Sequence, residues 1–228
     1  MTVTSKGPVI AIDGPAGAGK TTAARGLAER LSFVYLDTGA TFRAVALKGT
    51  RADLDLNDGP SIEALAREAD IRFSGERLER ILLDGEDVSE AIRGADMARG
   101  SAAVAVHPGV RARLVELWRE IACRGGIVIE GRDIGTVVFP DADIKFFIDA
   151  EPEARARRRF GERQGKESTS FEQVVRDLAA RDEKDRNREH SPLLRADDAI
   201  LIDTTTLSAD QTVDRLVSLV ANLPAAGR

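Results

Sequence analysis

The stretch Gly14-Pro-Ala-Gly-Ala-Gly-Lys20-Thr21 carries the clearest chemistry in this 228-residue sequence, because it fits the pattern G-x-x-x-x-G-K-[ST]. Glycines let a backbone turn tightly so that several N–H groups point at phosphate oxygens, and a following helix adds its N-terminal dipole. Lys20 is expected to reach the β- and γ-phosphates, and Thr21 to ligate Mg²⁺. The pattern therefore predicts a site for the phosphates of a nucleoside triphosphate.

The residues that accompany such a loop decide which reaction it serves. A GTPase needs an Asn-Lys-x-Asp guanine motif, and the sequence contains none. A motor or transport ATPase usually has an apolar strand that ends in paired acids. The nearest candidate, Val128-Ile-Glu-Gly-Arg-Asp133, separates its two acids with an arginine. Neither class is favoured.

Arginine is the residue type that does accompany the loop. Transfer of a phosphoryl group between two anionic nucleotides needs positive charge to hold both anions and to stabilise the transition state. On a helix, Arg181, Asp185 and Arg188 share one face, which could hold a phosphate and a ribose hydroxyl together. Taken alone, the same mixture of charges equally describes a solvated helix with weak ion pairs. The arginines considered are Arg43, Arg111, Arg132, Arg155, Arg157, Arg158, Arg159, Arg181, Arg186 and Arg188.

Short apolar runs that alternate with helical patterns must position these side chains. The alternation predicts an α/β fold with a parallel sheet of about five strands and helices on both faces. A different pattern, a small antiparallel β-meander, is expected within residues 59–94, which we interpret as an insertion into a core of residues 1–58 and 95–228. The expected core strands are 8–12, 33–36, 127–129, 144–148 and 199–202, and the expected helices include 20–31, 39–48, 61–68, two helices separated at Pro108, and 209–221.

The composition narrows the partners. The formal net charge is −5, so no bulk attraction to nucleic acid or to an anionic membrane is expected. Cys123 is the only cysteine, which excludes an intramolecular disulfide and a cysteine-based metal cage. No signal-peptide pattern and no apolar run of about 20 residues is present. These features favour a free cytoplasmic protein.

From end to end, the sequence resembles the bacterial cytidylate (CMP) kinases. Two blocks are highly specific: one begins at Gly131-Arg-Asp and runs to Ala142, and the other is Arg181-Asp-Glu-Lys-Asp-Arg-Asn-Arg188. The resemblance implies a nucleoside monophosphate kinase fold with a nucleotide-binding insertion and a short lid at about 155–167. It also implies a monomer that uses ATP, Mg²⁺ and CMP or dCMP. Further matching stretches are 12–21, 36–43, 84–89 and 108–111.

The resemblance also implies roles for individual residues. Those expected to bind the CMP phosphate are Arg43, Arg132 and Arg188. The cytosine edge is expected to contact Thr38, Arg111 and Asp133, and the ribose Arg181 and Asp185. The residues expected at ATP are Gly14, Pro15, Ala16, Gly17, Ala18, Gly19, Lys20, Thr21, Thr22 and Arg158, with Thr21 also at Mg²⁺. Lys20, Arg132 and Arg158 are expected to act in catalysis.

Two departures from the family pattern stand out. Phe42 occupies a position where tyrosine is common, and Ala102 occupies one where a serine often contacts the acceptor, with Ser101 one residue earlier. The alternatives are a kinase for UMP and CMP, and a non-catalytic nucleotide sensor. The intact Lys20 and Thr21 favour the enzyme.

Overall fold

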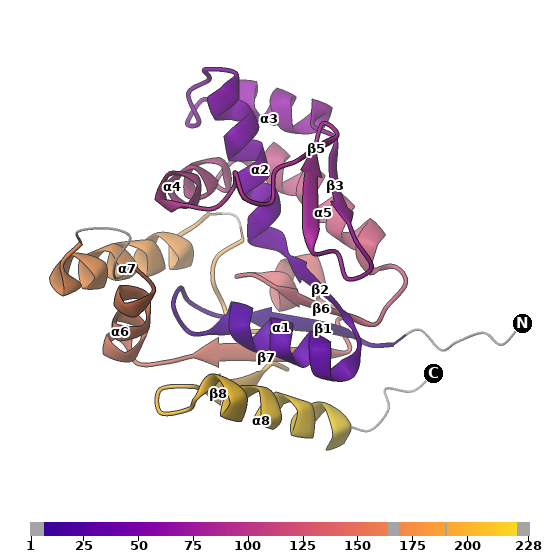
Figure 1. Cartoon of the computed structure of the whole chain (residues 1–228), viewed down its shortest axis with the longest axis vertical. Helices are drawn as coiled ribbons and strands as arrows, with labels where there is room; N and C mark the ends of the chain where they lie inside the picture. Colours follow the sequence, from indigo (N-terminus) through magenta and orange to yellow (C-terminus); the bar gives the residue numbers. More distant parts are fainter. Residues whose placement is uncertain (1–6, 164–168, 190, 223–228) are drawn as a thin grey trace, which may run out of the picture. The chain divides into compact units, whose positions relative to one another are not determined.

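The computed structural model describes residues 7–163, 169–189 and 191–222 (Figure 1). The chain divides into two compact units: Met1–Phe33 together with Gly126–Arg228, and Val34–Gly125. Among the described residues, no helix is both long and apolar enough to cross a membrane.

A parallel five-stranded sheet with the order β2-β6-β1-β7-β8 confirms the predicted fold class. Strand β1 pairs in parallel with β6 and with β7, and β7 pairs in parallel with β8. Strands buried on both faces need apolar residues throughout, and Ile10, Ala11 and Ile12 of β1 are fully buried. The strands are β1 (Val9–Asp13), β2 (Val34–Asp37), β6 (Ile127–Glu130), β7 (Ile144–Asp149) and β8 (Ile200–Asp203).

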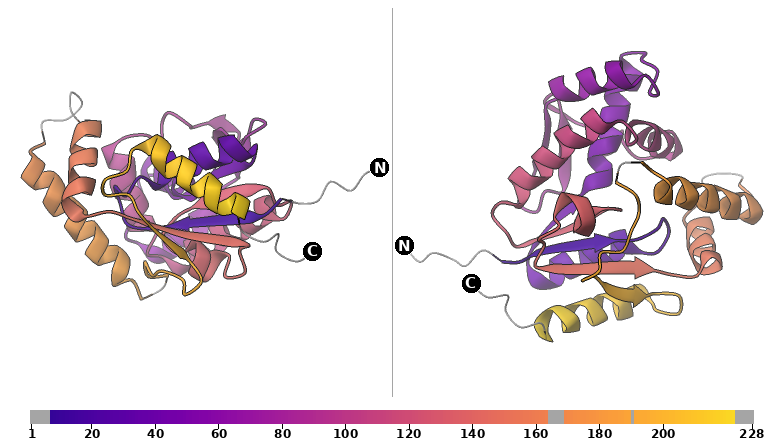
Figure 2. Two further views of the ribbon diagram at one scale, coloured as in Figure 1. Left: turned by 90° about the horizontal axis from the view of Figure 1, so that it is seen from below. Right: turned by 180° about the vertical axis from the view of Figure 1, so that it is seen from behind.

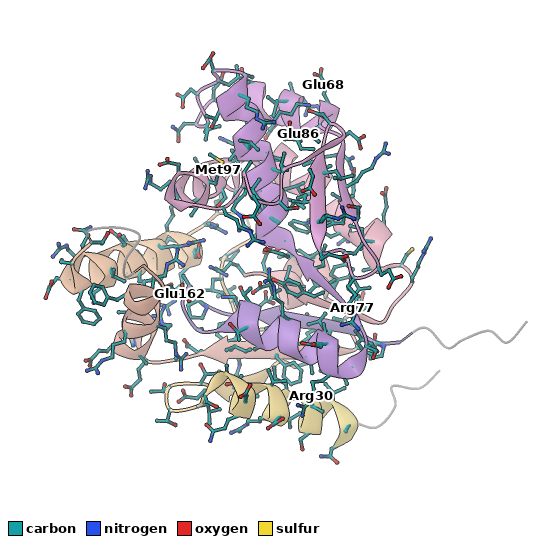
Figure 3. All side chains as sticks on the ribbon, viewed as in Figure 1. Arg30, Glu68, Arg77, Glu86, Met97 and Glu162 are labelled. Atoms are coloured by element: carbon teal, nitrogen blue, oxygen red, sulfur yellow. The ribbon has the colours of Figure 1, made fainter. Side chains whose placement is uncertain are left out.

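Helices α1 (Lys20–Leu31) and α8 (Ala209–Asn222) pack side by side in the first unit (Figure 2). Gly26 permits this approach, because a Cβ there would lie 2.5 Å from a methyl group of Val213. At the surface, Arg30 forms a 2.7 Å ion pair with Asp214 (Figure 3). The other helices of this unit are α6 (Pro152–Arg163), α7 (Phe171–Arg186) and the π-helix η1 (Ile134–Val138).

The second unit combines helices with a small antiparallel sheet of order β3-β4-β5, which confirms the predicted β-meander. Helix α2 packs against α3, α4 and α5, and its last turn is tied to β5 by an exposed ion pair between Arg51 and Glu86 (Figure 3). The elements are α2 (Thr38–Arg51), α3 (Gly59–Glu68), β3 (Ile71–Ser74), β4 (Arg80–Leu83), β5 (Glu86–Asp87), α4 (Ala95–Val104) and α5 (Pro108–Ala122).

Several element bounds differ from the sequence-based expectation for local reasons. Helix α2 begins at Thr38 because the Asp37 carboxylate caps it and accepts the Ala40 N–H at 3.0 Å. Strand β4 begins at Arg80, because Leu78 adopts a left-handed backbone (φ 58°) in the preceding turn. The second compact unit, Val34–Gly125, is longer at both ends than the predicted insertion, 59–94. That residues 59–94 form a separate nucleotide-binding insertion stays a prediction.

Candidate active site

The phosphate loop lies between β1 and α1, as its pattern predicts. Gly14 (φ 145°) cannot be replaced without movement, because a Cβ there would lie 1.9 Å from the Ile148 carbonyl oxygen. Gly19 caps α1 in a left-handed conformation (φ 88°). The loop therefore leads directly into a helix N-terminus, whose first N–H groups have no partner within the helix. That is the local geometry of an anion site.

Lys20 is buried, although it carries the ammonium group expected at the phosphates. Its side chain is accessible over only a small fraction of its surface, and Nζ donates to the Pro15 carbonyl oxygen at 2.7 Å. Burial lowers the pKa of Lys20 well below its usual value, and the positive charges of Arg132 and Arg181 lower it further, against the opposing effect of Glu130. An anionic ligand would relieve this accumulation of positive charge.

Asp13 joins the phosphate loop to the segment that carries the Gly131-Arg-Asp block. Its two carboxylate oxygens accept the backbone N–H groups of Ile134 at 2.8 Å and Gly135 at 2.7 Å. Burial raises the pKa of Asp13 to about 6, although these two hydrogen bonds act in the opposite direction. The segment that it binds is the π-helix η1, a geometry that occurs frequently at functional sites.

Arg132, Asp185 and Arg188 form one ion-pair network. Arg132 Nε donates to Asp185 Oδ2 at 2.9 Å, and Arg188 Nη2 pairs with the other oxygen, Oδ1. Burial alone would raise the pKa of Asp185, but the charges of Arg132 and Arg188 outweigh it and hold that pKa below its usual value. The ionised carboxylate therefore fixes two of the arginines expected at the acceptor phosphate.

Arg181 differs from these arginines because it makes no hydrogen bond or ion pair with any residue that the structure describes. Burial, together with the positive charge of Arg132, lowers the pKa of Arg181 to about 10. The attraction of Asp185 offsets this only in part. Arg181 is half-buried, and its guanidinium donors are open to an acceptor supplied by a ligand.

Arg158 lies beside the phosphate loop. Its Nη1 donates to the Thr204 hydroxyl at 3.1 Å, and a Cβ built on Gly19 would lie 3.9 Å from the same nitrogen. Thr204 in turn donates to the Ala18 carbonyl oxygen at 3.0 Å. Thr204 belongs to no motif and was not predicted as a site residue. Its only signal in the sequence is its place directly after the last core strand, β8.

Asp133 and the threonines of the loop complete the predicted residues of the first unit. The Asp133 side chain is buried, and its carbonyl oxygen accepts the N–H groups of Val137 and Val138 in η1. Thr21 and Thr22 are exposed in the first turn of α1. No cluster of three or more His, Cys, Asp or Glu side chains able to hold a metal occurs among the described residues.

Thr38, Arg43 and Arg111 lie in the second unit. Asp37 orients Arg43 through a 2.9 Å ion pair, at the N-terminus of the same helix that begins with buried Thr38. The Arg111 guanidinium lies over the Phe42 ring at 5.6 Å from its centroid. Each unit thus collects its own share of the predicted acceptor residues.

The second unit supports these side chains with an aromatic pair. Phe42 meets Trp118 edge to face, with centroids 5.6 Å apart, and Trp118 Nε1 donates to the Thr41 hydroxyl at 3.2 Å. The Phe42 ring is therefore a packing platform under Arg111. Ser101, the neighbour of Ala102, donates its hydroxyl hydrogen to the Ala98 carbonyl oxygen of its own helix at 3.0 Å.

The structure describes only part of the lid predicted at 155–167. Residues 155–163 belong to α6, and residues 164–167 lie outside the described part of the chain. Arg155, where the predicted lid begins, is buried.

Comparison with known proteins assigns the family. The cytidylate kinase family model matches residues 10–222. The cytidylate kinase of Desulfitobacterium hafniense is 50% identical over 212 residues, covering 92% of this chain and 91% of that protein. That of Syntrophotalea carbinolica is 46% identical, with 93% and 92% covered. A solved structure of an uncharacterized protein from Eubacterium ventriosum has a similar fold, with TM-score 0.50, 14% identity, and coverage of 95% and 99%. The chain belongs to the cytidylate kinase family.

Proposed function

We propose that the chain transfers the γ-phosphoryl group of ATP to CMP or dCMP in a Mg²⁺-dependent reaction, giving ADP and CDP or dCDP. Membership of the family gives the reaction class, phosphoryl transfer to a nucleoside monophosphate. One observation supports the proposal most directly: the positive charges of Arg132 and Arg181 act on Lys20 and lower its pKa. Lys20 is expected at the donor phosphates and the two arginines at the acceptor.

This concentration of positive charge suits the chemistry of phosphoryl transfer. Donor and acceptor nucleotides repel each other, and negative charge spreads over the transferring group in the transition state. Lys20 is proposed to hold the β- and γ-phosphates, and Arg132 and Arg188 the acceptor phosphate. Because Asp185 fixes both arginines before the reaction, little reorganisation is needed when charge develops. Arg158, held beside Gly19, is proposed to contact the donor phosphates.

Recognition of the acceptor base is assigned to three more residues, and that of its ribose to Arg181 and Asp185. Cytosine offers an amino donor at N4 and acceptors at N3 and O2, so its edge needs an acid and a donor such as arginine. Asp133 and Arg111 provide these types, with Thr38 as a third polar contact. Arg181 is proposed to bind the ribose with Asp185. The ribose hydroxyls would give the Arg181 guanidinium an acceptor that no described residue supplies.

The residues present also fit a magnesium ion. Mg²⁺ normally keeps several waters and shares substrate phosphates, with only one or two protein ligands. The exposed Thr21 hydroxyl, in the first turn of α1, is such a single ligand, and the described residues offer no larger protein cage. When bound, the ion would neutralise charge on the β- and γ-phosphates. Lys20 and the arginines orient the two nucleotides.

The proposal is tested by identifying the products. The purified chain, incubated with ATP, Mg²⁺ and CMP, should give ADP and CDP in equal amounts by anion-exchange chromatography. Without CMP, ADP release should be far slower. Formation of ADP without CDP would show hydrolysis and would contradict the proposal. Binding of ATP with no turnover of any monophosphate would favour the non-catalytic sensor.

A further inference from the structure

Arg155 is an arginine of α6 that faces the protein interior. Its side chain is 6% exposed, as is that of its partner Asp182 on α7. Nη1 donates to Asp182 Oδ2 at 2.5 Å and to the Ala16 carbonyl oxygen of the phosphate loop at 3.0 Å. Nε donates to the Ala150 carbonyl oxygen, also at 3.0 Å. One guanidinium thus joins the loop, the end of β7 and α7.

The phosphate loop also packs directly against α6 and α7, which lie side by side (Figure 1). Ala16 belongs to an apolar cluster whose other members lie on these two helices. The backbone of Gly17 approaches α6 so closely that a Cβ would lie 3.2 Å from both the Cβ and the carbonyl oxygen of Arg155. The other members of the cluster are Ala156, Phe160, Phe171, Val174 and Leu178.

The identity of the two charged residues fits a positioning role. Only a planar guanidinium presents enough donors in fixed directions to reach three acceptors on three segments. Asp182 compensates the buried charge, and it adjoins Arg181 on the helix that also carries Asp185. The second oxygen of Asp182, Oδ1, is buried with no hydrogen-bond partner among the described residues, so the carboxylate is held by Arg155.

We infer that Arg155 is a positioning residue for the ATP phosphates, anchored by Asp182, and that it acts by fixing the phosphate loop at Ala16. It does not contact nucleotide. This inference deepens the proposed function, since it rests on the loop being the donor site. Loss of the Arg155 contact should leave the loop free to adopt conformations that bind phosphates less well, which weakens donor binding before it affects the acceptor.

The test is the dissociation constant for ADP, measured by calorimetry on the full chain without CMP. Arg155→Lys keeps the charge but cannot reach all three acceptors, and Asp182→Asn keeps the shape of the side chain. Each should weaken ADP binding about tenfold, the effect of roughly one lost hydrogen bond to a positioned group. Arg157→Lys is the matched control, because Arg157 lies on the same helix, is exposed, and pairs with Glu153 one turn earlier. It should leave ADP binding unchanged.

The outcomes separate positioning from mere stabilisation. A lowered Tm with unchanged ADP affinity in both variants would overturn the inference. If neither variant folds, the milder Asp182→Glu decides, because it keeps the charge and moves the carboxylate by one methylene group. Unchanged ADP affinity in that variant would also overturn the inference. Because ADP binding needs no acceptor, absence of CDP formation would contradict the proposed function without affecting this result.

Discussion

Lys20 occupies a position that is unfavourable for an ammonium group until an anion arrives. Burial and the neighbouring arginines both lower its pKa, and its one hydrogen bond in the structure goes to the Pro15 carbonyl oxygen of the same loop. Such an environment costs stability, so the residue is best explained by the charge that it meets in the reaction.

Replacement of Lys20 tests this explanation. Lys20→Ala should lower kcat by several orders of magnitude, because it removes a cation that stabilises the transferring phosphoryl group. The fold should survive, since the substitution also removes a buried charge, and circular dichroism with thermal melting will check this. Substantial activity in a folded Lys20→Ala variant would mean that the loop does not serve the reaction.

Asp13 provides a pH-dependent test. Its pKa rises from an ordinary value near 4 to about 6 in the folded protein. Protonated Asp13 therefore contributes fully to the free energy of unfolding below about pH 4. This contribution, on the order of 3 kcal/mol, is lost as the pH rises to about 6 and above. The free energy of unfolding of the wild type should fall relative to that of Asp13→Asn across this range. A constant difference between the two proteins would contradict the assignment.

The residues that the sequence revealed are those with short-range signals. Lys20 and Arg132 belong to recognisable local blocks, and the structure puts them where those blocks predict. Arg188 was expected on one helix face with Arg181 and Asp185, but α7 ends at Arg186 and Arg188 lies just beyond its C-cap, Asn187. Asp13 and Thr204 act through contacts with segments 121 and 186 residues away, at Ile134 and Ala18. No local pattern encodes such a pairing, although both residues lie at the carboxyl ends of core strands, where ligands gather.

Helix α7 presents its functional residues along one face. Asp185 is held by Arg132 and Arg188. Arg181, one turn earlier, makes no ion pair with a described residue, and the positive charges of Arg132, Arg159 and Arg188 lower its pKa, whereas Asp185 raises it. The two positions therefore differ in their effect on stability, although both are assigned to the acceptor ribose.

Substitutions along α7 should separate these effects. Arg181→Ala should raise KM for CMP at least tenfold while Tm stays equal or rises, because crowded positive charge is removed. Asp185→Ala should raise the same KM but lower Tm, since it leaves two arginines without their buried partner. KM for ATP should change far less in both. Glu183→Ala, exposed on the same helix, is the control. Equal losses of affinity for both nucleotides would contradict the ribose assignment.

Periodicity predicted the regular elements well and the irregular one poorly. Helix α1 has the predicted bounds because apolar spacing and the preceding glycine define both its face and its start. The π-helix η1 was not predicted, because it depends on a contact that is distant in the sequence. Its first two N–H groups, of Ile134 and Gly135, donate to the carboxylate of Asp13 at the end of β1. The sequence of residues 134–138 resembles an ordinary β-branched run.

At the scale of the whole molecule, the chain combines two parts. A parallel sheet flanked by helices holds the donor loop. The second compact unit, made of helices and a β-meander, holds Thr38, Arg43 and Arg111. Strand alternation predicted the parallel class, but strand order follows from long-range pairing that local patterns do not specify. The limits of the two units likewise depend on how α2 and α5 pack, which composition does not reveal.

The most direct test of the whole account is kcat/KM for phosphoryl transfer from ATP, compared across CMP, dCMP, UMP, AMP and GMP. The assigned base contacts predict the highest value with CMP or dCMP. Purine monophosphates should be poorer by two or more orders of magnitude, because a site built for hydrogen bonds to one base leaves its polar groups unpaired with another. A clear preference for AMP, or no turnover with any of the five, would contradict it.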